Sequence, residues 1–206
     1  MAVNATNDTM TSTMSDALAR ARDPLAPDEV RVYLLDNGES ETVRDATRRL
    51  LALQLHCPLD SIELGIEGKG KPYLVTDPAL CFSISHSHDV SMVALTRVAP
   101  IGVDVERVRV VPHAEMILRR FFSPDQIAQI LSDDNRDFRF VEAWTRAEAT
   151  VKVRGASVWE VATPDPFVTV RSIPAPDGFA AAVAVRSEHW RTTGVSLSVA
   201  ALRDAL

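Results

Sequence analysis

The amino-acid sequence predicts an α+β fold built from two halves of similar size. Apolar runs of strand length occur in both halves of the chain, and segments with helical periodicity accompany each group of strands. The 206 residues are 46% hydrophobic and 24% charged, which is typical of a globular protein with a sizeable core. We expect a polar, mobile tail over residues 1–28, an N-terminal α+β half over residues 29–100 and a C-terminal α+β half over residues 101–206.

The elements expected in the N-terminal half alternate between strands and helices. Within the tail, SDALARAR at residues 15–22 has the composition of a short helix. Segment 39–55 carries apolar residues at helical spacing with charges between them, which indicates an amphipathic helix. The glycines and the proline of EGKGKP, residues 67–72, indicate a turn. The expected strands are residues 30–35, 61–66, 81–85 and 90–96.

The C-terminal half begins with IGVDVE at residues 101–106, which we expect to be a strand. Ser123 followed by Pro124, with Gln126 three residues after the serine, is an N-terminal helix signature. Gly155 is expected to end the longest helix. The expected helices are residues 112–122, 123–131 and 136–153, and the expected strands are residues 167–172, 179–185 and 194–199, with a short helix after them.

Composition excludes several classes of protein. The net charge of −6 and the pI near 5.4 disfavour a nucleic-acid binder. The only two cysteines, Cys57 and Cys81, make neither a disulfide framework nor a metal-binding repeat. The sequence contains no apolar stretch of membrane-spanning length and no signal-peptide core. We therefore expect a cytoplasmic protein that binds neither nucleic acid nor membrane.

The stretch GVDVERVR, residues 102–109, places two carboxylates in an apolar strand. Side chains on a strand alternate between faces, so Asp104 and Glu106 share one face, with their Cα atoms about 7 Å apart. Two like charges held side by side are a candidate metal site. A solvated strand face explains the same spacing equally well.

The long helix adds a third carboxylate. Trp144, Glu148 and Lys152 are spaced four residues apart and lie on one stripe. An exposed ion pair between Glu148 and Lys152 is the commoner explanation of such spacing. Trp144 on the same stripe favours a partly buried surface, on which a carboxylate needs a partner.

Asp104, Glu106 and Glu148 together would repel one another unless a cation lay between them. Oxygen ligands of this kind suit Mg²⁺ or Mn²⁺, which bind substrate phosphates through their open positions. Lys152 and Lys71 could add positive charge for such a phosphate. Each of these residues has an ordinary explanation on its own, but together they indicate a metal and a phosphate.

Five motifs occur in this order: GKPYL, FSISHS, IGVDVERV, RRFFS and WTRAEATVKVRG. In that order and at these spacings, they resemble the 4′-phosphopantetheinyl transferases of the broad-specificity type that activates surfactin synthetase. The resemblance covers about residues 60 to 160. It implies two α+β halves related by a pseudo-twofold axis, with coenzyme A bound in the cleft between them.

The resemblance also implies an activity, that of a holo-[acyl-carrier-protein] synthase. The 4′-phosphopantetheine arm would move from coenzyme A to a serine hydroxyl of an apo carrier protein, in a Mg²⁺-dependent reaction that releases 3′,5′-adenosine bisphosphate. Fatty-acid, polyketide and non-ribosomal peptide carriers are all compatible with the sequence. The broad-specificity type further implies a monomer.

The roles of single residues follow from the matching motifs. Glu148 would also accept the proton of the carrier serine, and Lys152 would steady the pyrophosphate. Phe121 and Phe122 begin the stretch that receives the carrier, although we expect at least one of them to belong to the core. The metal ligands would be Asp104, Glu106 and Glu148, the catalytic residues Glu148, Lys152 and Asp104, and the coenzyme A contacts Gly70, Lys71, Pro72, Ser85 and His86.

The sequence departs from the family at two places. Ala147 stands where related enzymes often have lysine, and the basic region before GKP is short, with Arg44, Arg48 and Arg49 as its clustered cations. Two other functions stay open at this stage. One is a carrier-binding homologue with weakened catalysis, and the other is an unrelated Mg²⁺-dependent phosphate hydrolase.

Overall fold

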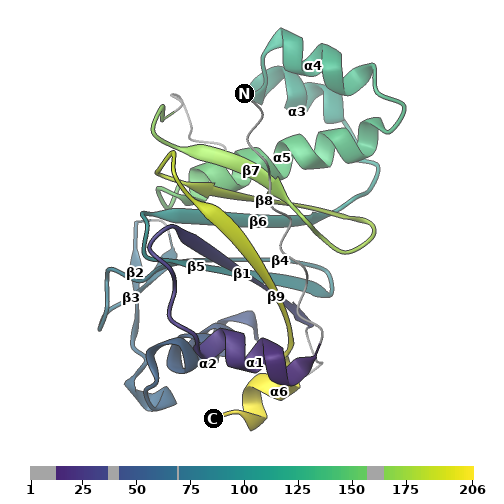
Figure 1. The fold of residues 1–206 in the computed structure, drawn as a ribbon. Coiled ribbons are helices and arrows are strands. Elements are labelled where there is room, and N and C mark those ends of the chain that lie inside the picture. Colours follow the sequence, from purple (N-terminus) through teal and green to yellow (C-terminus); the bar gives the residue numbers. More distant parts are fainter. Residues whose placement is uncertain (1–12, 37–41, 69, 157–164) are drawn as a thin grey trace.

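The computed structural model describes residues 13–36, 42–68, 70–156 and 165–206, and it contains two sheets packed face to face with helices outside each (Figure 1). One sheet has the strand order β4-β5-β1-β9 and the other β6-β8-β7, while β2 and β3 form a separate hairpin. The strands are β1 Glu29–Asp36, β2 Leu64–Glu67, β3 Lys71–Leu74, β4 Cys81–Ser87, β5 Val90–Thr96, β6 Ile101–Arg107, β7 Thr169–Ile173, β8 Phe179–Val185 and β9 Arg191–Ser198. The helices are α1 Met14–Arg22, α2 Val43–Leu55, α3 Ala114–Phe121, α4 Pro124–Leu131, α5 Arg136–Lys152 and α6 Val199–Asp204, with a short 3₁₀ turn at Leu59–Ser61.

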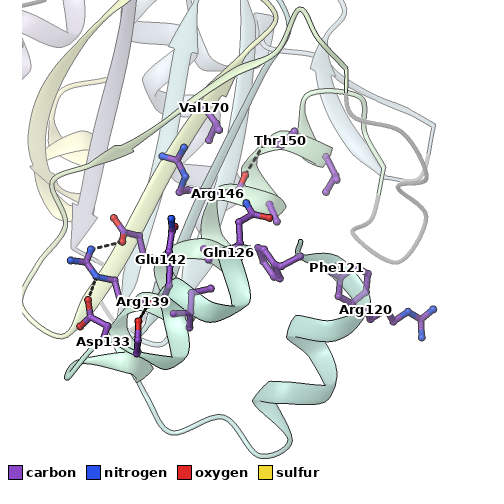
Figure 2. Close-up of a pocket in the computed structure, with 16 residues that line it drawn as sticks. Arg120, Phe121, Gln126, Asp133, Arg139, Glu142, Arg146, Thr150 and Val170 are labelled. Atoms are coloured by element: carbon purple, nitrogen blue, oxygen red, sulfur yellow. Dashed lines mark hydrogen bonds and ion pairs between the residues drawn. The ribbon is translucent and has the colours of Figure 1, made fainter. Parts of the chain in front are cut away.

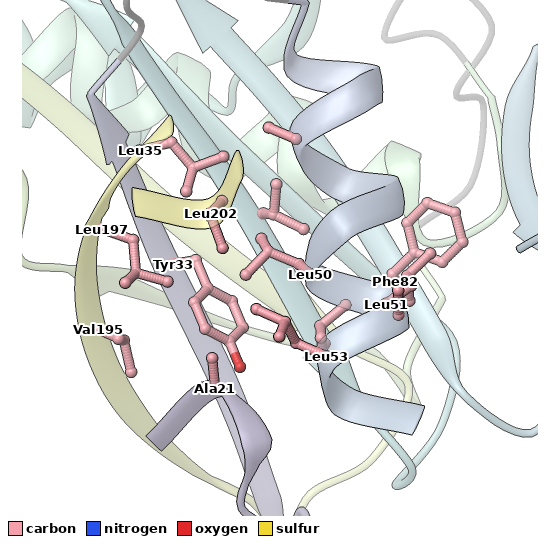
Figure 3. Close-up of a cluster of buried hydrophobic side chains, with 14 of the residues drawn as sticks. Ala21, Tyr33, Leu35, Leu50, Leu51, Leu53, Phe82, Val195, Leu197 and Leu202 are labelled. Atoms are coloured by element: carbon pink, nitrogen blue, oxygen red, sulfur yellow. The ribbon is translucent and has the colours of Figure 1, made fainter. Parts of the chain in front are cut away.

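The outer face of the four-stranded sheet is covered by α1, α2 and α6 (Figures 1 and 3). Leu50 and Leu51 of α2 pack against Tyr33 of β1 and Leu197 of β9, and all four are fully buried or nearly so. Helix α2 begins where the Thr42 hydroxyl accepts from the amide of Asp45. This core holds α1, α2 and α6 against β1 and the strands beside it.

The two sheets share a second core. Val30 and Met92 of the four-stranded sheet pack against Val103, Val105 and Val183 of the three-stranded sheet. Because side chains alternate along β6, the valines face this core and Asp104 and Glu106 face the opposite side. That opposite side is the one on which α5 lies.

Helix α5 covers the three-stranded sheet, and the pair α3 and α4 lies beyond it, with α4 packed against α5 (Figure 1). The expected signature at the start of α4 is confirmed as a capping box, in which Ser123 and Gln126 each accept from the other's backbone amide. Helix α5 spans the expected segment and ends at Lys152. The helix is long enough to place Glu148 and Lys152 beside β6.

The α+β class is confirmed, whereas the division into two halves stays a prediction, and two of its expected boundaries differ from the structure. Residues 14–22 form α1, whose Ala17 and Ala21 are buried in the first core, so this part of the expected tail is an ordered helix, while residues 1–12 lie outside the described residues. Strand β9 returns to the N-terminal sheet and pairs in parallel with β1, although the expected division assigns it to residues 101–206. Its apolar Val195 and Leu197 complete the first core, which is the physical reason for the return.

The β2–β3 hairpin and the last helix can also be compared with the expected elements. The turn expected at residues 67–72 is shorter in the structure, because β3 begins at Lys71 and pairs with β2, which ends at Glu67, in an antiparallel hairpin. The short helix expected after the final strand is confirmed as α6. Among the described helices, none combines the length and the apolar character that a membrane crossing requires.

Candidate active site

Asp104 and Lys152 form the centre of the candidate site. The Lys152 ammonium donates to Oδ1 of Asp104 over 2.7 Å and to the carbonyl of Val103 over 3.2 Å. The hydroxyl of Ser85, on β4, donates to the same Oδ1 over 2.8 Å and lies 3.0 Å from Lys152 Nζ. Strand β4 of one sheet, strand β6 of the other and helix α5 therefore meet at one carboxylate oxygen.

Glu106 lies beside this centre on the same face of β6. Its Oε2 accepts a hydrogen bond of 3.0 Å from the hydroxyl of Ser87, and Arg109 Nη1 lies 3.5 Å from the same oxygen. Asp104 is only 3% exposed, so a solvated strand face does not describe it. The side chain of Glu106 is 29% exposed and borders solvent.

Gly102 brings α5 close to β6. A Cβ atom added at Gly102 would lie 2.0 Å from the carbonyl oxygen of Ala149 and 2.9 Å from Cβ of Lys152. Only glycine permits this approach, because any side chain would overlap the backbone of α5. The short separation lets the Lys152 ammonium reach Asp104.

Burial is the largest influence on the pKa values of Asp104 and Glu148. It raises the pKa of Asp104 above the usual value, although Lys152 and Ser85 act in the opposite direction. Burial also raises the pKa of Glu148, and the charge of Asp104 raises it further. Lys152 forms its ion pair with Asp104, so the simple surface pair with Glu148 does not describe this lysine.

A metal ion is expected between the carboxylates, and Asp104 provides the test of fit. Within the described ranges, no three histidine, cysteine or acidic side chains stand close enough together to hold a metal as they are. However, Oδ2 of Asp104 is buried and has no hydrogen-bond partner among those residues. A buried carboxylate oxygen without a donor is costly, and a hard cation is a partner that would satisfy it. Asp104 therefore fits a ligand role, and the set with Glu106 and Glu148 stays a prediction.

The expected coenzyme A contacts on the β2–β3 hairpin line a pocket of about 230 Å³. Gly70, Lys71 and Pro72 line it together with Lys152 and Gly155. The Lys71 ammonium donates to the carbonyls of Ile101 and Val153 over 3.0 and 2.9 Å, and burial lowers its pKa. In this structure Lys71 ties the hairpin to β6 and to the end of α5.

The other two expected contacts point to opposite faces of β4. Ser85 joins the Asp104 centre, whereas His86, the next residue, is exposed. The role of His86 stays a prediction. Sequence reasoning missed Ser87 and Gly102, although the alternation of serines in FSISHS and the lone glycine of IGVDVE carried the signal.

Residues 100–200 match the sequence profile of the 4′-phosphopantetheinyl transferase superfamily. The chain carries a domain of this superfamily. The matched region contains the strand of Asp104 and Glu106 and the helix of Glu148 and Lys152. The resemblance inferred from the five motifs is thereby confirmed.

Curated relatives bear names of the same superfamily. The chain is 33% identical over 128 residues to the 4′-phosphopantetheinyl transferase psf-1 of Bacillus pumilus, covering 61% of this chain and 54% of that protein. It is 28% identical over 196 residues to the 4′-phosphopantetheinyl transferase HetI of a Nostoc species, covering 86% and 80% respectively. A 4′-phosphopantetheinyl transferase of Bacillus subtilis is 32% identical over 130 residues, covering 61% and 56%. The chain thus spans a little over half the length of the two Bacillus relatives.

The superfamily domain also carries a large groove, of about 850 Å³, between α5 and the α3–α4 pair (Figure 2). Phe121 and Phe122 line it, and Phe121 meets the ring of Trp144 edge-on at 5.8 Å. Arg139 bridges Asp133 and Glu142 at one end of the groove, with distances of 2.9 and 3.0 Å. The lining of the groove thus includes both aromatic rings and charged groups.

Proposed function

We propose that this chain transfers the 4′-phosphopantetheine arm of coenzyme A to a serine hydroxyl of an acyl or peptidyl carrier protein. The observation that carries the proposal is the contact of Asp104 with Lys152 and Ser85 at the point where the two sheets meet. It joins the acidic strand and the basic end of α5, which both lie in the matched region of residues 100–200, to the pocket beside the hairpin.

The reaction needs a base for the carrier serine. The hydroxyl oxygen would form a bond to the phosphorus that bears the pantetheine arm, and the bond from that phosphorus to the bridging oxygen would break. Glu148 is the candidate base, because a carboxylate with a raised pKa holds a proton more readily near neutral pH. The leaving group is 3′,5′-adenosine bisphosphate, and the charge on its terminal phosphate would lie near the Lys152 ammonium.

Asp104, Glu106 and Glu148 would hold Mg²⁺, or Mn²⁺ in its place. When bound, the ion would neutralise charge on the pyrophosphate, which is the main service that a metal performs in phosphoryl-type transfer. Asp104 offers its buried Oδ2 for this purpose. The hydroxyls of Ser85 and Ser87 donate hydrogen bonds to Asp104 and Glu106 respectively.

Coenzyme A would lie along the hairpin, with its phosphates in the pocket lined by Gly70, Pro72 and Lys152. In the basic region, Arg48 donates to the carbonyls of Leu59 and Ile62, so this cation serves the fold. The carrier would occupy the groove beside Phe121 and Phe122. We expect a cytoplasmic monomer, whose sedimentation would show one chain per particle.

The decisive experiment uses an apo carrier protein, coenzyme A and Mg²⁺. Intact-protein mass spectrometry should show the carrier gaining one 4′-phosphopantetheine arm, and omission of Mg²⁺ should stop the reaction. A carrier of unchanged mass that still co-elutes with this chain would instead support a carrier-binding homologue with weakened catalysis. Hydrolysis of coenzyme A without a carrier would support a phosphate hydrolase.

A further inference from the structure

Three serines of β4 form a row that faces the edge of the neighbouring sheet. Ser83, Ser85 and Ser87 alternate along the strand, and their partners in β5 include Ala94 and Met92 of the core between the sheets. All three serines are buried or nearly so. Strand β6, which they face, is an edge strand of its own sheet.

Each serine caps one backbone amide of β6. The hydroxyl oxygens of Ser83, Ser85 and Ser87 accept from the amides of Val103, Val105 and Arg107 over 3.0, 3.3 and 3.2 Å. The separation is 20 residues in every case. The serines therefore take the place of a neighbouring strand, whose carbonyls would ordinarily satisfy such an edge.

Two of the three hydroxyls also donate to a carboxylate. Ser85 donates to Asp104 over 2.8 Å and Ser87 donates to Glu106 over 3.0 Å, each to the residue 19 positions further along the chain. For Ser83 the corresponding position is Gly102, which has no side chain. The row thus repeats one pattern three times, and glycine leaves its first member without a carboxylate.

A hydroxyl has one proton to donate and lone pairs to accept with. Because the β6 amide occupies a lone pair, the hydroxyl protons of Ser85 and Ser87 remain available to bind the adjacent carboxylates. For Ser87, the Glu106 oxygen at 3.0 Å is nearer than His88 Nδ1 at 3.4 Å. One serine side chain can therefore satisfy a backbone amide at the edge of a sheet and also hold a carboxylate in position.

We propose that the row of Ser83, Ser85 and Ser87 is a side-chain ladder that joins the two sheets, and that Ser87 is a positioning residue that orients Glu106. The second part rests on the proposed function, in which Glu106 is a metal ligand. Ser87 itself touches neither coenzyme A nor the reacting atoms in this assignment.

Three variants separate the two parts: Ser83→Ala, Ser87→Ala and Ser87→Thr. Amide hydrogen exchange requires neither metal nor coenzyme A. We expect Ser83→Ala to speed exchange at Val103 and Ser87→Ala to speed exchange at Arg107, with Ser87→Thr close to wild type. Unchanged exchange at both amides would overturn the ladder.

Orientation of Glu106 is measured with Mn²⁺ alone, by titration calorimetry on the full chain. Loss of one hydrogen bond to a charged group weakens an interaction by roughly tenfold. We expect Ser87→Ala to raise the Mn²⁺ dissociation constant about tenfold, Ser87→Thr to restore it, and Ser83→Ala to leave it within about twofold. Equal affinities in the two alanine variants would overturn the positioning role.

The proposed function and this inference fail in different ways. If the wild-type chain binds Mn²⁺ more tightly than Ser87→Ala but transfers no arm to a carrier, the proposed function fails and the positioning role stands. If the wild-type chain binds no Mn²⁺, the orientation of Glu106 as a ligand is overturned, and the exchange rates alone decide the ladder.

Discussion

The ammonium of Lys152 lies 2.7 Å from Oδ1 of Asp104, while Oδ2 of the same carboxylate is buried without a hydrogen-bond partner among the described residues. One oxygen of Asp104 is thus paired with a cation of the protein, and the other is left for a group that the described residues do not supply.

Asp104→Asn should abolish transfer without unfolding the protein. Burial raises the pKa of Asp104, so folding opposes its ionisation, and the stability contributed by the protonated form is lost as pH rises through the raised pKa. The asparagine variant carries no such charge. We therefore expect its melting temperature at pH 7 to equal or exceed that of the wild type, with the difference shrinking toward pH 4. A variant that melts several degrees lower at pH 7 would show that the Lys152 pair outweighs burial.

Glu148→Gln and Lys152→Ala should act on the same step of the reaction. Glutamine keeps the shape of Glu148 and removes its charge, and a lost general base usually costs about 10²-fold or more in turnover. Lys152→Ala should lower turnover as well. The two losses should not add, because both groups serve one transition state. Steady-state rates of both single variants and the double variant test this, and near-normal turnover in Glu148→Gln would contradict it.

Gly102→Ala should separate α5 from β6. The new Cβ would lie 2.0 Å from the carbonyl oxygen of Ala149, so the helix that carries Glu148 and Lys152 must move. We expect a loss of about 1–3 kcal/mol in the free energy of unfolding, the usual range for overpacking, together with a large loss of transfer. Gly194→Ala, on β9, is the matched control, because its Cβ would meet nothing within 4 Å. Equal denaturation midpoints for the two variants would contradict the close packing.

Lys71→Met should destabilise the protein even when no coenzyme A is present. Methionine keeps most of the apolar stem but leaves the carbonyls of Ile101 and Val153 without their donor, at a cost of about 1–3 kcal/mol. A lysine that served only to bind phosphate would leave the ligand-free stability unchanged. Urea denaturation of the ligand-free protein distinguishes these outcomes.

Glu29→Gln should destabilise the protein, because Glu29 is a buried carboxylate that stabilises the fold and has no part in the proposed chemistry. Burial opposes the charge of Glu29, but hydrogen bonds from Arg31, Thr193 and the amide of Ala26 outweigh it and lower the pKa to about 2. The stability that results is present above the usual pKa near 4.5 and is lost as pH falls toward 2. We expect the variant to lose roughly 3 kcal/mol at pH 7, from about 1.4 kcal/mol per pKa unit.

The control for Glu29 is Glu115→Gln. Glu115 is exposed and lies 3.7 Å from Arg119, so its substitution should cost less than about 0.5 kcal/mol. Urea denaturation between pH 2 and pH 7 compares the two variants with the wild type. A flat pH dependence of the wild-type stability below pH 4.5 would contradict the role of Glu29.

Local patterns in the sequence predicted most elements, because they depend on neighbours in the chain. The alternation of Val103 and Val105 with Asp104 and Glu106 identified both faces of β6, and Ser123 with Gln126 identified the start of α4. Those patterns need no knowledge of distant residues.

The remaining features depend on contacts between distant segments. Composition predicted the short helix of α1 but left it in a mobile tail, because the sheet that buries Ala17 lies elsewhere in the chain. Similarly, Lys71 has the sequence context of an exposed turn lysine, and only the approach of Val153 shows that its ammonium is held by the backbone. The pairing of Lys152 with Asp104 likewise depends on the glycine that draws α5 inward.

The parallel pairing of β1 with β9 affects how the chain can fold while it is being synthesised. Residues 29–36 leave the ribosome early, but their edge partner, residues 191–198, emerges only after the whole of the second sheet. The first core therefore stays incomplete during most of synthesis, since Val195, Leu197 and Leu202 are among its buried members. A nascent chain stalled before Arg191 should consequently expose β1 to chaperones, although every residue proposed for chemistry has already been added.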